Sequence, residues 1–400
     1  MSSKSAINSV KTGVISYAWV ILVVVYLASV VAPFNQFKIP PIMPYLMQTF
    51  QIDLTQAGLL MSIIAAIGLI LAIPSGIVVQ RLGSRATIMI ALGLMAGGAM
   101  AGALSRNYAF LLGSRILEGI GMGLIGVAAP ATIAMWFPPE KQGIPMGIWA
   151  TWVPVGLVVI YNLSPAMASS LGWQSLWWIG TGFAVVMMVI SGLLITHPPA
   201  QGHANLRNQA APNLGQALAN RNIWLLALEF ACMNLAMVSL GTFYPTFLSE
   251  VRGYPLGQAA FVSSIATLLV LFSAPAAGWL SDRIGSRRLV FSLPFLGIAA
   301  LFIFPFRVTG WQIITVMIVQ GLLVGAIPTA TFAAASEVMR KPEWAGLGLA
   351  VVLIGQNIGQ LLGPILFGEI VERSGWVMAG YLLIPFCLVG FVSGWMVKVR

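Results

Sequence analysis

Long apolar runs alternate with short polar breaks along the whole chain. Each run carries few or no charges over about 20 residues, which is the length that a helix needs to cross the hydrocarbon core of a bilayer. The pattern predicts an all-α integral membrane protein with twelve spanning helices. We expect these helices at residues 16–47, 55–79, 86–104, 108–136, 144–169, 174–196, 222–249, 257–281, 288–307, 310–337, 345–372 and 376–397.

The longest polar break separates the sixth predicted helix from the seventh and is rich in proline and asparagine. These residues favour turns and irregular backbone over a continuous helix. We therefore expect an N-terminal six-helix bundle at residues 1–196, a cytoplasmic linker at 197–221 and a C-terminal six-helix bundle at 222–400.

A loop rich in glycine and arginine occurs twice, each time between two apolar runs. The first copy reads Gly76-Ile-Val-Val-Gln80-Arg81-Leu-Gly83-Ser-Arg85. The second copy begins 202 residues later and reads Gly278-Trp-Leu-Ser-Asp282-Arg283-Ile-Gly285-Ser-Arg287-Arg288. Glycine at a tight turn supplies backbone angles that other residues avoid, and arginines beside a span favour the cytoplasmic side.

A second pair of motifs falls in the same register. The first half contains Arg115-Ile-Leu-Glu118-Gly119-Ile-Gly121-Met-Gly123, and the same offset of 202 leads to Gln320-Gly321 with Gly325. Two paired motifs at one offset indicate an internal duplication, and so two halves of related structure.

The two loops resemble the motif G-x-L-x-D-R-x-G-R-[RK] of the major facilitator superfamily of secondary transporters, and the run from Arg115 resembles the fourth helix of that family. The resemblance covers essentially the whole chain. It implies two pseudo-symmetric six-helix bundles and alternating access to a site between them. It also implies a conformational gating role for Gly76, Gln80, Arg81, Gly83, Arg85, Gly278, Asp282, Arg283, Gly285 and Arg287. Gln80 stands where the family has an aspartate that helps to lock the outward-open state, so that role is expected of Asp282.

Composition and charge placement agree with a membrane protein. Charged residues make up 8% of the chain and apolar residues 59%, and the mean hydropathy is +0.93. The formal net charge is +10, but with a cytoplasmic N-terminus fourteen Lys and Arg residues fall on inside segments and four on outside segments. We therefore expect a multi-pass protein of the prokaryotic cytoplasmic (cell inner) membrane with both termini in the cytoplasm. The excess charge favours anionic membrane lipids as partners and no nucleic acid.

Residue types that carry enzyme chemistry are scarce. The two cysteines, Cys232 and Cys387, and the two histidines, His197 and His203, lack the spacing of a metal site. No histidine cluster, paired aspartate motif or phosphate loop occurs. We expect neither an enzyme, nor a metal, nor a cofactor, and we expect a monomer because the duplication already supplies both halves of a site.

Lys38 lies in the first predicted span, between Asn35 and the prolines Pro40 and Pro41. A lysine inside a span costs about 2.5–3.5 kcal/mol on insertion scales. Its side chain therefore reaches the outer interface, faces a bound anion or forms a buried pair with a carboxylate. The sequence leaves these three interpretations open.

Two carboxylates also fall within predicted spans. Glu118 follows Arg115 by three residues, so both lie on one face of a helix, either as a structural pair or as a proton acceptor beside a cation. Glu229 lies about two turns from the cytoplasmic end of its span, where it is a candidate for proton coupling or for a gate. We take Glu118 and Glu229 as the candidates for proton coupling.

The predicted function is secondary active transport of a small organic or inorganic anion by alternating access, with proton coupling as a further expectation. Cations and neutral amides suit an anion, and the first helices resemble cyanate-type and related small-anion members of the family. The expected substrate-binding residues are Lys38, Arg115, Asn35, Trp152, Tyr244, Gln356, Asn357 and Gln360.

Two other functions stay open. The first is proton-coupled export of hydrophobic or cationic compounds, with Glu118 or Glu229 as the drug and proton site, although the Gly-Pro signature of proton antiporters is missing from the fifth predicted span. The second is a sensor on the same fold, which would bind its ligand without accumulating it in vesicles.

Overall fold

The computed structural model describes residues 2–72, 74–138, 141–196, 219–339 and 345–399, and every regular element in this part of the chain is a helix. The first half contains α1 (Ser2–Gln36), η1 (Pro40–Ile42), α2 (Met43–Phe50), α3 (Leu54–Leu71), α4 (Pro74–Leu82), α5 (Ser84–Ala103), α6 (Tyr108–Trp136), α7 (Gly143–Ala150), α8 (Trp152–Leu171) and α9 (Gln174–Leu194). The second half contains α11 (Arg221–Glu250), α12 (Leu256–Ile284), α13 (Arg287–Leu301), α14 (Trp311–Val324), α15 (Ala326–Val338), α16 (Ala345–Ser374) and α17 (Trp376–Met396).

The prediction of a twelve-span helical membrane protein is confirmed. Eleven spans in the described part of the chain are long and apolar enough to cross a bilayer. The remaining predicted span, at 288–307, corresponds to α13, a helix of 15 residues that continues into turns. The linker predicted at 197–221 lies mostly outside the described residues, so the proposed boundaries between the bundles stay a prediction.

Several predicted spans are broken into two helices. The span expected at 16–47 stops at Gln36 and resumes as η1 and α2, because Pro40 and Pro41 have no N–H to continue the hydrogen-bond ladder. Similar breaks separate α3 from α4, α7 from α8 and α14 from α15. Broken helices at membrane depth are tolerated where they are buried in protein or line a cavity.

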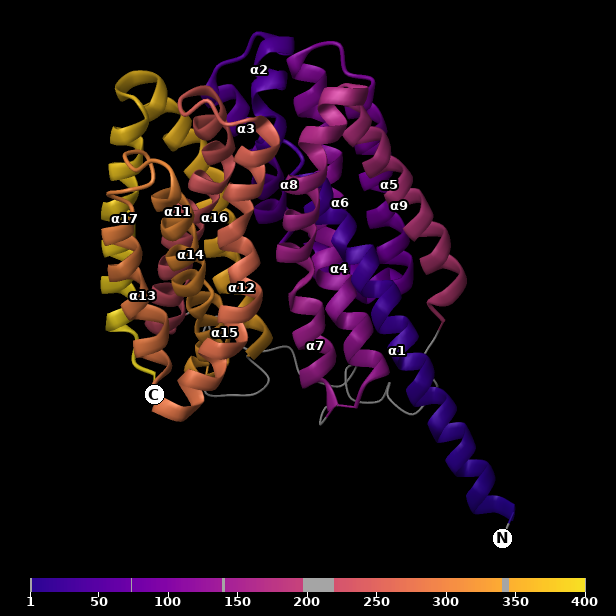
Figure 1. The fold of residues 1–400 in the computed structure, drawn as a ribbon. Helices are drawn as coiled ribbons and strands as arrows, with labels where there is room; N and C mark the ends of the chain where they lie inside the picture. Colours follow the sequence, from indigo (N-terminus) through magenta and orange to yellow (C-terminus); the bar gives the residue numbers. More distant parts are fainter. Residues whose placement is uncertain (1, 73, 139–140, 197–218, 340–344, 400) are drawn as a thin grey trace.

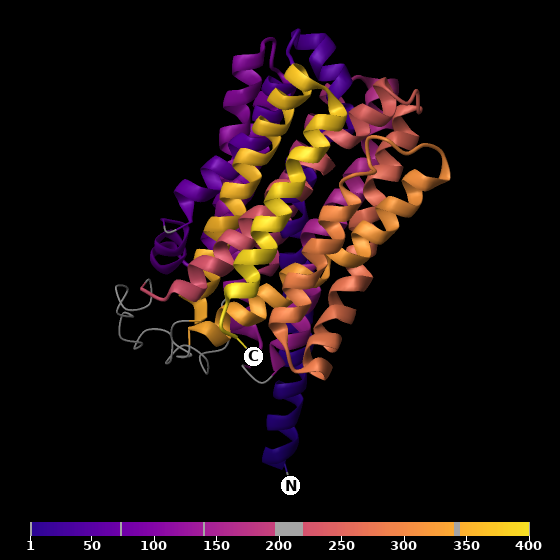
Figure 2. The same cartoon turned by 90° about the vertical axis from the view of Figure 1, so that its left-hand side faces the viewer.

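The helices form two groups, α1–α9 and α11–α17, which lie side by side in Figure 1. Figures 1 and 2 place both chain termini at one end of the molecule, which we call the termini end, with α2 at the opposite end, the α2 end. The main contacts between the groups join α3 to α16 and α8 to α12, with η1 against α11 and α12.

Contacts between the groups are concentrated toward the α2 end. Gly257, at the start of α12, lies against Pro165 in the last turns of α8. The amide N–H of Leu54, the first residue of α3, donates to Glu372 Oε1 over 2.9 Å, so a carboxylate near the end of α16 caps a helix of the other group. The two groups are therefore in contact at the α2 end.

The internal repeat extends to backbone conformation. Gly83 and Gly285, the turn glycines of the repeated loop, have φ angles of 82° and 68°. Gly172 and Gly375, before α9 and α17, both have a φ angle of 82°. Such angles are easily reached only by glycine, so both halves require this residue at corresponding turns.

Candidate functional site

The broken end of α1 is stabilised by an arginine from another helix. The carbonyl of Gln36 would normally accept from residue 40, but Pro40 has no N–H. Arg115 of α6 replaces that donor: its Nη2 donates to the Gln36 carbonyl over 2.9 Å and its Nη1 to the Asn35 carbonyl over 2.8 Å. The Arg115 Nε also donates to the Leu60 carbonyl of α3 over 3.2 Å. Arg115 thus joins three elements of the first half.

Lys38 follows the break and points into the first half. Its Nζ donates to Glu118 Oε1 over 2.6 Å and to Asn35 Oδ1 over 3.0 Å, and it lies 4.4 Å from the centre of the Trp177 ring. The other Glu118 oxygen, Oε2, accepts from Arg115. Of the three interpretations of Lys38, the structure therefore selects the buried pair. The expectation that it reaches the outer interface is wrong, because a carboxylate lies within reach.

Lys38, Arg115 and Glu118 form what we call the charged cluster. Their side chains are 0%, 0% and 1% exposed, respectively. Two cations and one carboxylate leave a formal charge of +1 when all three are ionised. Buried charges are tolerated only when paired and hydrogen-bonded, and these are held by each other, by main-chain carbonyls and by an aromatic ring. The structural pairing of Arg115 with Glu118 is thus observed, enlarged by Lys38.

A chain of neutral amides crosses from the first half to the second beside this cluster. Gln36 Nε2 donates to Gln360 Oε1 over 3.4 Å, and Gln360 Nε2 donates to Asn234 Oδ1 over 3.2 Å. Gln36 directly follows Asn35, whose side chain holds Lys38. We call Gln36, Gln360 and Asn234 the amide chain. It joins α1, α16 and α11 and brings one predicted site residue, Gln360, next to the charged cluster.

The other predicted amides lie one turn away on α16. Gln356 and Gln360 are four residues apart and therefore lie on one face of α16. This face lies between the face whose glycines pack on α11 and the face that packs on α3. Asn357 lies on the α3 side, where its Oδ1 is 2.7 Å from the position that a Cβ at Gly68 would occupy. Its Nδ2 donates to the Leu353 carbonyl.

Two predicted aromatic site residues lie apart from the charged cluster. Trp152 stacks on Trp149 with ring centres 5.5 Å apart, and Trp149 donates to Ser29 of α1. Tyr244 donates to the Pro305 carbonyl over 3.1 Å and stacks on Phe247. These partners are structural, although Tyr244 also lines the cavity in the second half.

Glu229 is buried in the second half rather than open to solvent at the termini end. Its side chain is 0% exposed, and its Oε2 accepts from the Thr331 hydroxyl of α15 over 3.0 Å. Among the described residues no cation lies within ion-pair distance of this carboxylate. The two candidates for proton coupling therefore differ, since Glu118 holds two cations and Glu229 holds a hydroxyl.

The residues of the repeated loop lie at the termini end, and their described contacts stay within one half. Arg85 donates to the Gly192 carbonyl of α9, and Arg287 pairs with Glu337 of α15 over 2.6 Å. Arg283 lies over the Trp279 ring at 5.2 Å. The remaining gating candidates belong to the same two helix–loop segments and are Gly76, Gln80, Arg81, Gly83, Gly278, Asp282 and Gly285. Asp282, expected to lock the outward-open state, is exposed.

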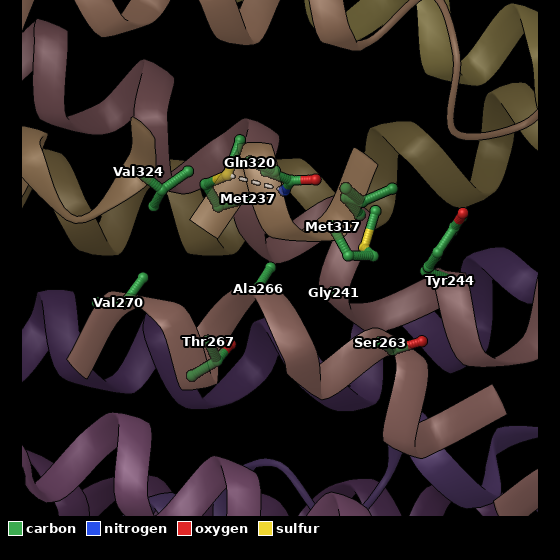
Figure 3. Close-up of a pocket in the computed structure, with 11 residues that line it drawn as sticks. Met237, Gly241, Tyr244, Ser263, Ala266, Thr267, Val270, Met317, Gln320 and Val324 are labelled. Atoms are coloured by element: carbon green, nitrogen blue, oxygen red, sulfur yellow. Dashed lines mark hydrogen bonds between the residues drawn. The ribbon is translucent and has the colours of Figure 1, made fainter. Parts of the chain in front are cut away.

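A cavity of about 80 Å³ lies in the second half between α11, α12 and α14 (Figure 3). Most of its wall is apolar, with Met237, Met317 and Val324 among the lining residues. In Figure 3 a dashed line joins the Gln320 amide nitrogen to the sulfur of the neighbouring Met237. Gly241, also in the wall, accepts a hydrogen bond from Tyr161 of α8, so the cavity borders the interface between the halves.

Sequence reasoning did not select Gln36, Asn234, Trp177 or Gln320 for the site. Gln36, Asn234 and Gln320 are amides inside apolar runs. Their position alone marks them as candidates for a polar site, because an unpaired amide in a membrane is costly. Trp177 gave no such signal, since aromatic residues in spans are usual. Among the described residues there is no group of metal-ligating side chains, and Cys232 and Cys387 are buried.

Taken together, a twelve-span helical fold in two related halves and a polar centre between apolar walls define a membrane transport protein. A sequence model of the Major Facilitator Superfamily matches residues 25–343 and 272–400. The chain therefore belongs to the Major Facilitator Superfamily, and it is a multi-pass membrane transporter of that family.

Curated relatives include transporters named for organic anions. The hexuronate transporter of Bacillus subtilis is 21% identical, with 91% of this chain and 90% of the relative aligned. The probable sulfoacetate transporter SauU of Cupriavidus necator is 21% identical over 94% and 91%. Among solved structures, a bacterial homologue of the human lysosomal transporter Spinster, inward-facing and unoccupied, superimposes with a TM-score of 0.83, 18% identity and coverage of 95% and 97%. This last similarity concerns the fold alone.

Proposed function

We propose that this protein is a secondary transporter of small organic anions, which bind between the halves and gain access from each side in turn. The observation that carries the proposal is the charged cluster. Two buried cations share one carboxylate, so a formal positive charge is held within the membrane next to the amide chain. A bound anion would neutralise that charge in a medium of low dielectric, where charges interact strongly.

The anion need not touch a cation. Every described donor contact of Arg115 goes to a carbonyl or to Glu118, and Lys38 is held by Glu118 and Asn35. The amides of Gln36, Gln360 and Gln356 are better placed to donate to a carboxylate, with the positive charge behind them. Neutral amides donate without the desolvation cost of a further buried charge.

Proton coupling fits the same cluster. Protonation of Glu118 removes its negative charge, raises the formal charge of the cluster to +2 and frees Lys38 from its partner. Each change strengthens attraction for an anion, so proton and anion binding would reinforce each other. The named substrates of the two relatives, hexuronate and sulfoacetate, are organic anions, which supports this choice of substrate class.

The proposal also covers the orientation of the protein in the membrane and its oligomeric state. We place both termini in the cytoplasm, in keeping with the distribution of lysine and arginine, and the membrane is that of a prokaryotic cell. We take the α2 end, where the two halves are in contact, as the outer side, and on that basis we assign the structure to an inward-facing state. One chain supplies both halves of the site, so we propose a functional monomer.

A thermal-shift screen of purified protein against small carboxylates, inorganic anions and lipophilic cations tests the proposal. A ligand stabilises the folded state in proportion to its concentration relative to Kd. We expect carboxylates to stabilise the parent protein and Lys38→Gln to weaken that binding roughly 10- to 30-fold, the effect of one charge at an intermediate dielectric. Lys398→Gln, which removes an exposed charge near the C-terminus, is the matched control and leaves binding unchanged.

Stabilisation by lipophilic cations alone, unaffected by Lys38→Gln, would show the proposal to be wrong and favour export of cationic compounds. In that case Glu229, which has no described cationic partner, is the next residue to replace. Binding of an anion without its accumulation in proteoliposomes would instead identify a sensor.

A further inference from the structure

The cavity in the second half is the counterpart of the charged cluster in the first. The offset of 202 carries Asn35, Lys38, Arg115 and Glu118 onto Met237, Leu240, Met317 and Gln320, respectively. All four of these second-half residues line the cavity. The same offset relates the N-cap of α3, Asp53, to the N-cap of α12, Pro255, so it is the register of the fold.

The chemistry of the two counterparts is opposite. In the first half, two cations and a carboxylate fill the space and satisfy one another. In the second half, leucine and methionine replace the cations and a neutral amide replaces the carboxylate. Leucine and methionine have shorter side chains than lysine and arginine, and a space of about 80 Å³ is left. The centre of the protein is therefore charged on one side and apolar on the other.

The one amide among these counterparts has a weak partner. Gln320 is 6% exposed, and its Nε2 lies 3.4 Å from the Met237 sulfur, which is a poor hydrogen-bond acceptor. Buried amides normally have stronger partners than a thioether sulfur, so Gln320 is the one polar exception among these four counterparts. Figure 3 shows this amide at the edge of the cavity.

The cavity and the amide chain are neighbours along α11. Asn234, Met237, Gly241 and Tyr244 are spaced by three, four and three residues and so lie on one face of the helix. Asn234 ends the amide chain, and Met237 begins the cavity one turn later, at a rise of about 4.5 Å. A ligand of a few bonds can therefore reach from one to the other.

We infer that the transported anion is a monocarboxylate with a short aliphatic chain. The carboxylate lies at the amide chain, facing the charged cluster, and the aliphatic chain enters the cavity formed by Met237, Leu240, Met317 and Gln320. A formal charge of +1 matches one carboxylate. A cavity of about 80 Å³ is roughly half of the 150 Å³ that admits benzene, so it suits about three to five carbons. This inference rests on the proposed function and specifies its substrate.

Calorimetric titration of the purified protein in detergent with straight-chain carboxylates from acetate to octanoate tests the inference, with empty micelles as the blank. We expect affinity to rise about fourfold per added methylene, the usual gain for burying this group, as far as pentanoate. Beyond that length the affinity levels off or falls, because the cavity is full.

A filled cavity is the second arm of the experiment. Ala266→Leu, in the cavity wall, should abolish the dependence on chain length and leave acetate binding within twofold. Ala276→Leu, the same change at an exposed position of the same helix, should preserve that dependence. If Ala266→Leu does not fold, Ala266→Val should reduce the gain in affinity per added methylene.

The outcomes separate the two proposals. If carboxylates bind with equal affinity at every chain length, the inference is overturned while anion transport stands. The same holds if Ala266→Leu keeps the parent protein's dependence of affinity on chain length. If no straight-chain carboxylate binds but another small organic anion stabilises the protein in the thermal-shift screen, the inference alone fails. If no organic anion binds in either experiment, the proposed function fails and the inference fails with it.

Discussion

Glu118 has a different task from every other described carboxylate, because each of its oxygens holds a buried cation. Without it, Lys38 and Arg115 would face each other unpaired in the interior. Arg115 also caps the C-terminal end of α1 by donating to two main-chain carbonyls. The cluster therefore both balances buried charges and satisfies backbone acceptors. At the scale of residues, one carboxylate thus balances two buried cations.

We expect Glu118→Gln to lower the free energy of unfolding by about 3–5 kcal/mol, because it leaves two cations without a buried counter-charge. Chemical denaturation in detergent measures this change. Lys38→Gln combined with Glu118→Gln should recover much of the loss, since the double variant again carries one net positive charge. A double variant no more stable than Glu118→Gln would mean that the two residues are not coupled.

Glu229→Gln, the same substitution in the second half, should change the free energy of unfolding by no more than about 1 kcal/mol. Its described partner is the Thr331 hydroxyl, which can bond equally well to an amide oxygen. The same denaturation experiment measures it. A loss as large as that of Glu118→Gln would point to a cationic partner for Glu229 and revise the contrast between the two acids.

At the scale of elements, close helix contacts organise the second half. Gly355, Gly359 and Gly363 of α16 are four residues apart and lie against the backbone of α11, which lets the two helices approach closely. The amide chain depends on this contact, because Gln360 of α16 reaches Asn234 of α11 beside it. Packing by small residues thus positions a polar group of the proposed site.

Gly363→Ala should lower the free energy of unfolding by about 1–3 kcal/mol, because the new Cβ would lie 2.6 Å from the Leu235 carbonyl oxygen. Gly346→Ala, in the same helix, has no described atom from outside that helix within 4 Å of the new Cβ and should raise it by about 0.5–1 kcal/mol through helix propensity. Thermal unfolding should show a lower unfolding temperature for Gly363→Ala and a higher one for Gly346→Ala than for the parent protein. Equal effects would mean that close packing at Gly363 is unimportant.

At the scale of the whole molecule, the two halves meet toward the α2 end. Glu372 caps α3, Tyr161 of α8 donates to the Gly241 carbonyl of α11, and Asn162 of α8 donates to Ser264 of α12 over 3.3 Å. These contacts are hydrogen bonds between halves that can be broken and re-formed. Rocking of the halves, as we propose for transport, has to break them in every cycle.

A cross-link at this end should stop transport. The position of a Cβ at Gly257 lies 4.0 Å from the Pro165 Cβ, within the range for a disulfide. In a background with Cys232→Ala and Cys387→Ala, the pair Pro165→Cys and Gly257→Cys should lose counterflow activity in proteoliposomes on oxidation and regain it on reduction. Each single cysteine variant is the control. Full activity with the disulfide formed would contradict separation of the halves at the α2 end.

The sequence by itself determined the local features of this protein. Twelve apolar runs, the repeated turn glycines and the family all follow from patterns within about 20 residues or from their repetition. The reason is that helix length, helix ends and turn angles depend on neighbouring residues. The same reasoning selected Lys38, Arg115, Glu118 and Gln360, since polar groups in apolar spans need partners.

Only the tertiary structure decided which of these groups meet. The partner of Lys38 is 80 residues away, and Gln36 and Gln360 are separated by 324 residues. Trp152 and Tyr244 looked equally suitable in the sequence, yet Trp152 stacks on Trp149 in the first half, whereas Tyr244 lines the cavity in the second half. Helices that are apolar on every face do not reveal which face meets which neighbour, so the rotation and pairing of the spans come from packing. Packing therefore placed a charged centre in one half and an apolar cavity in the other.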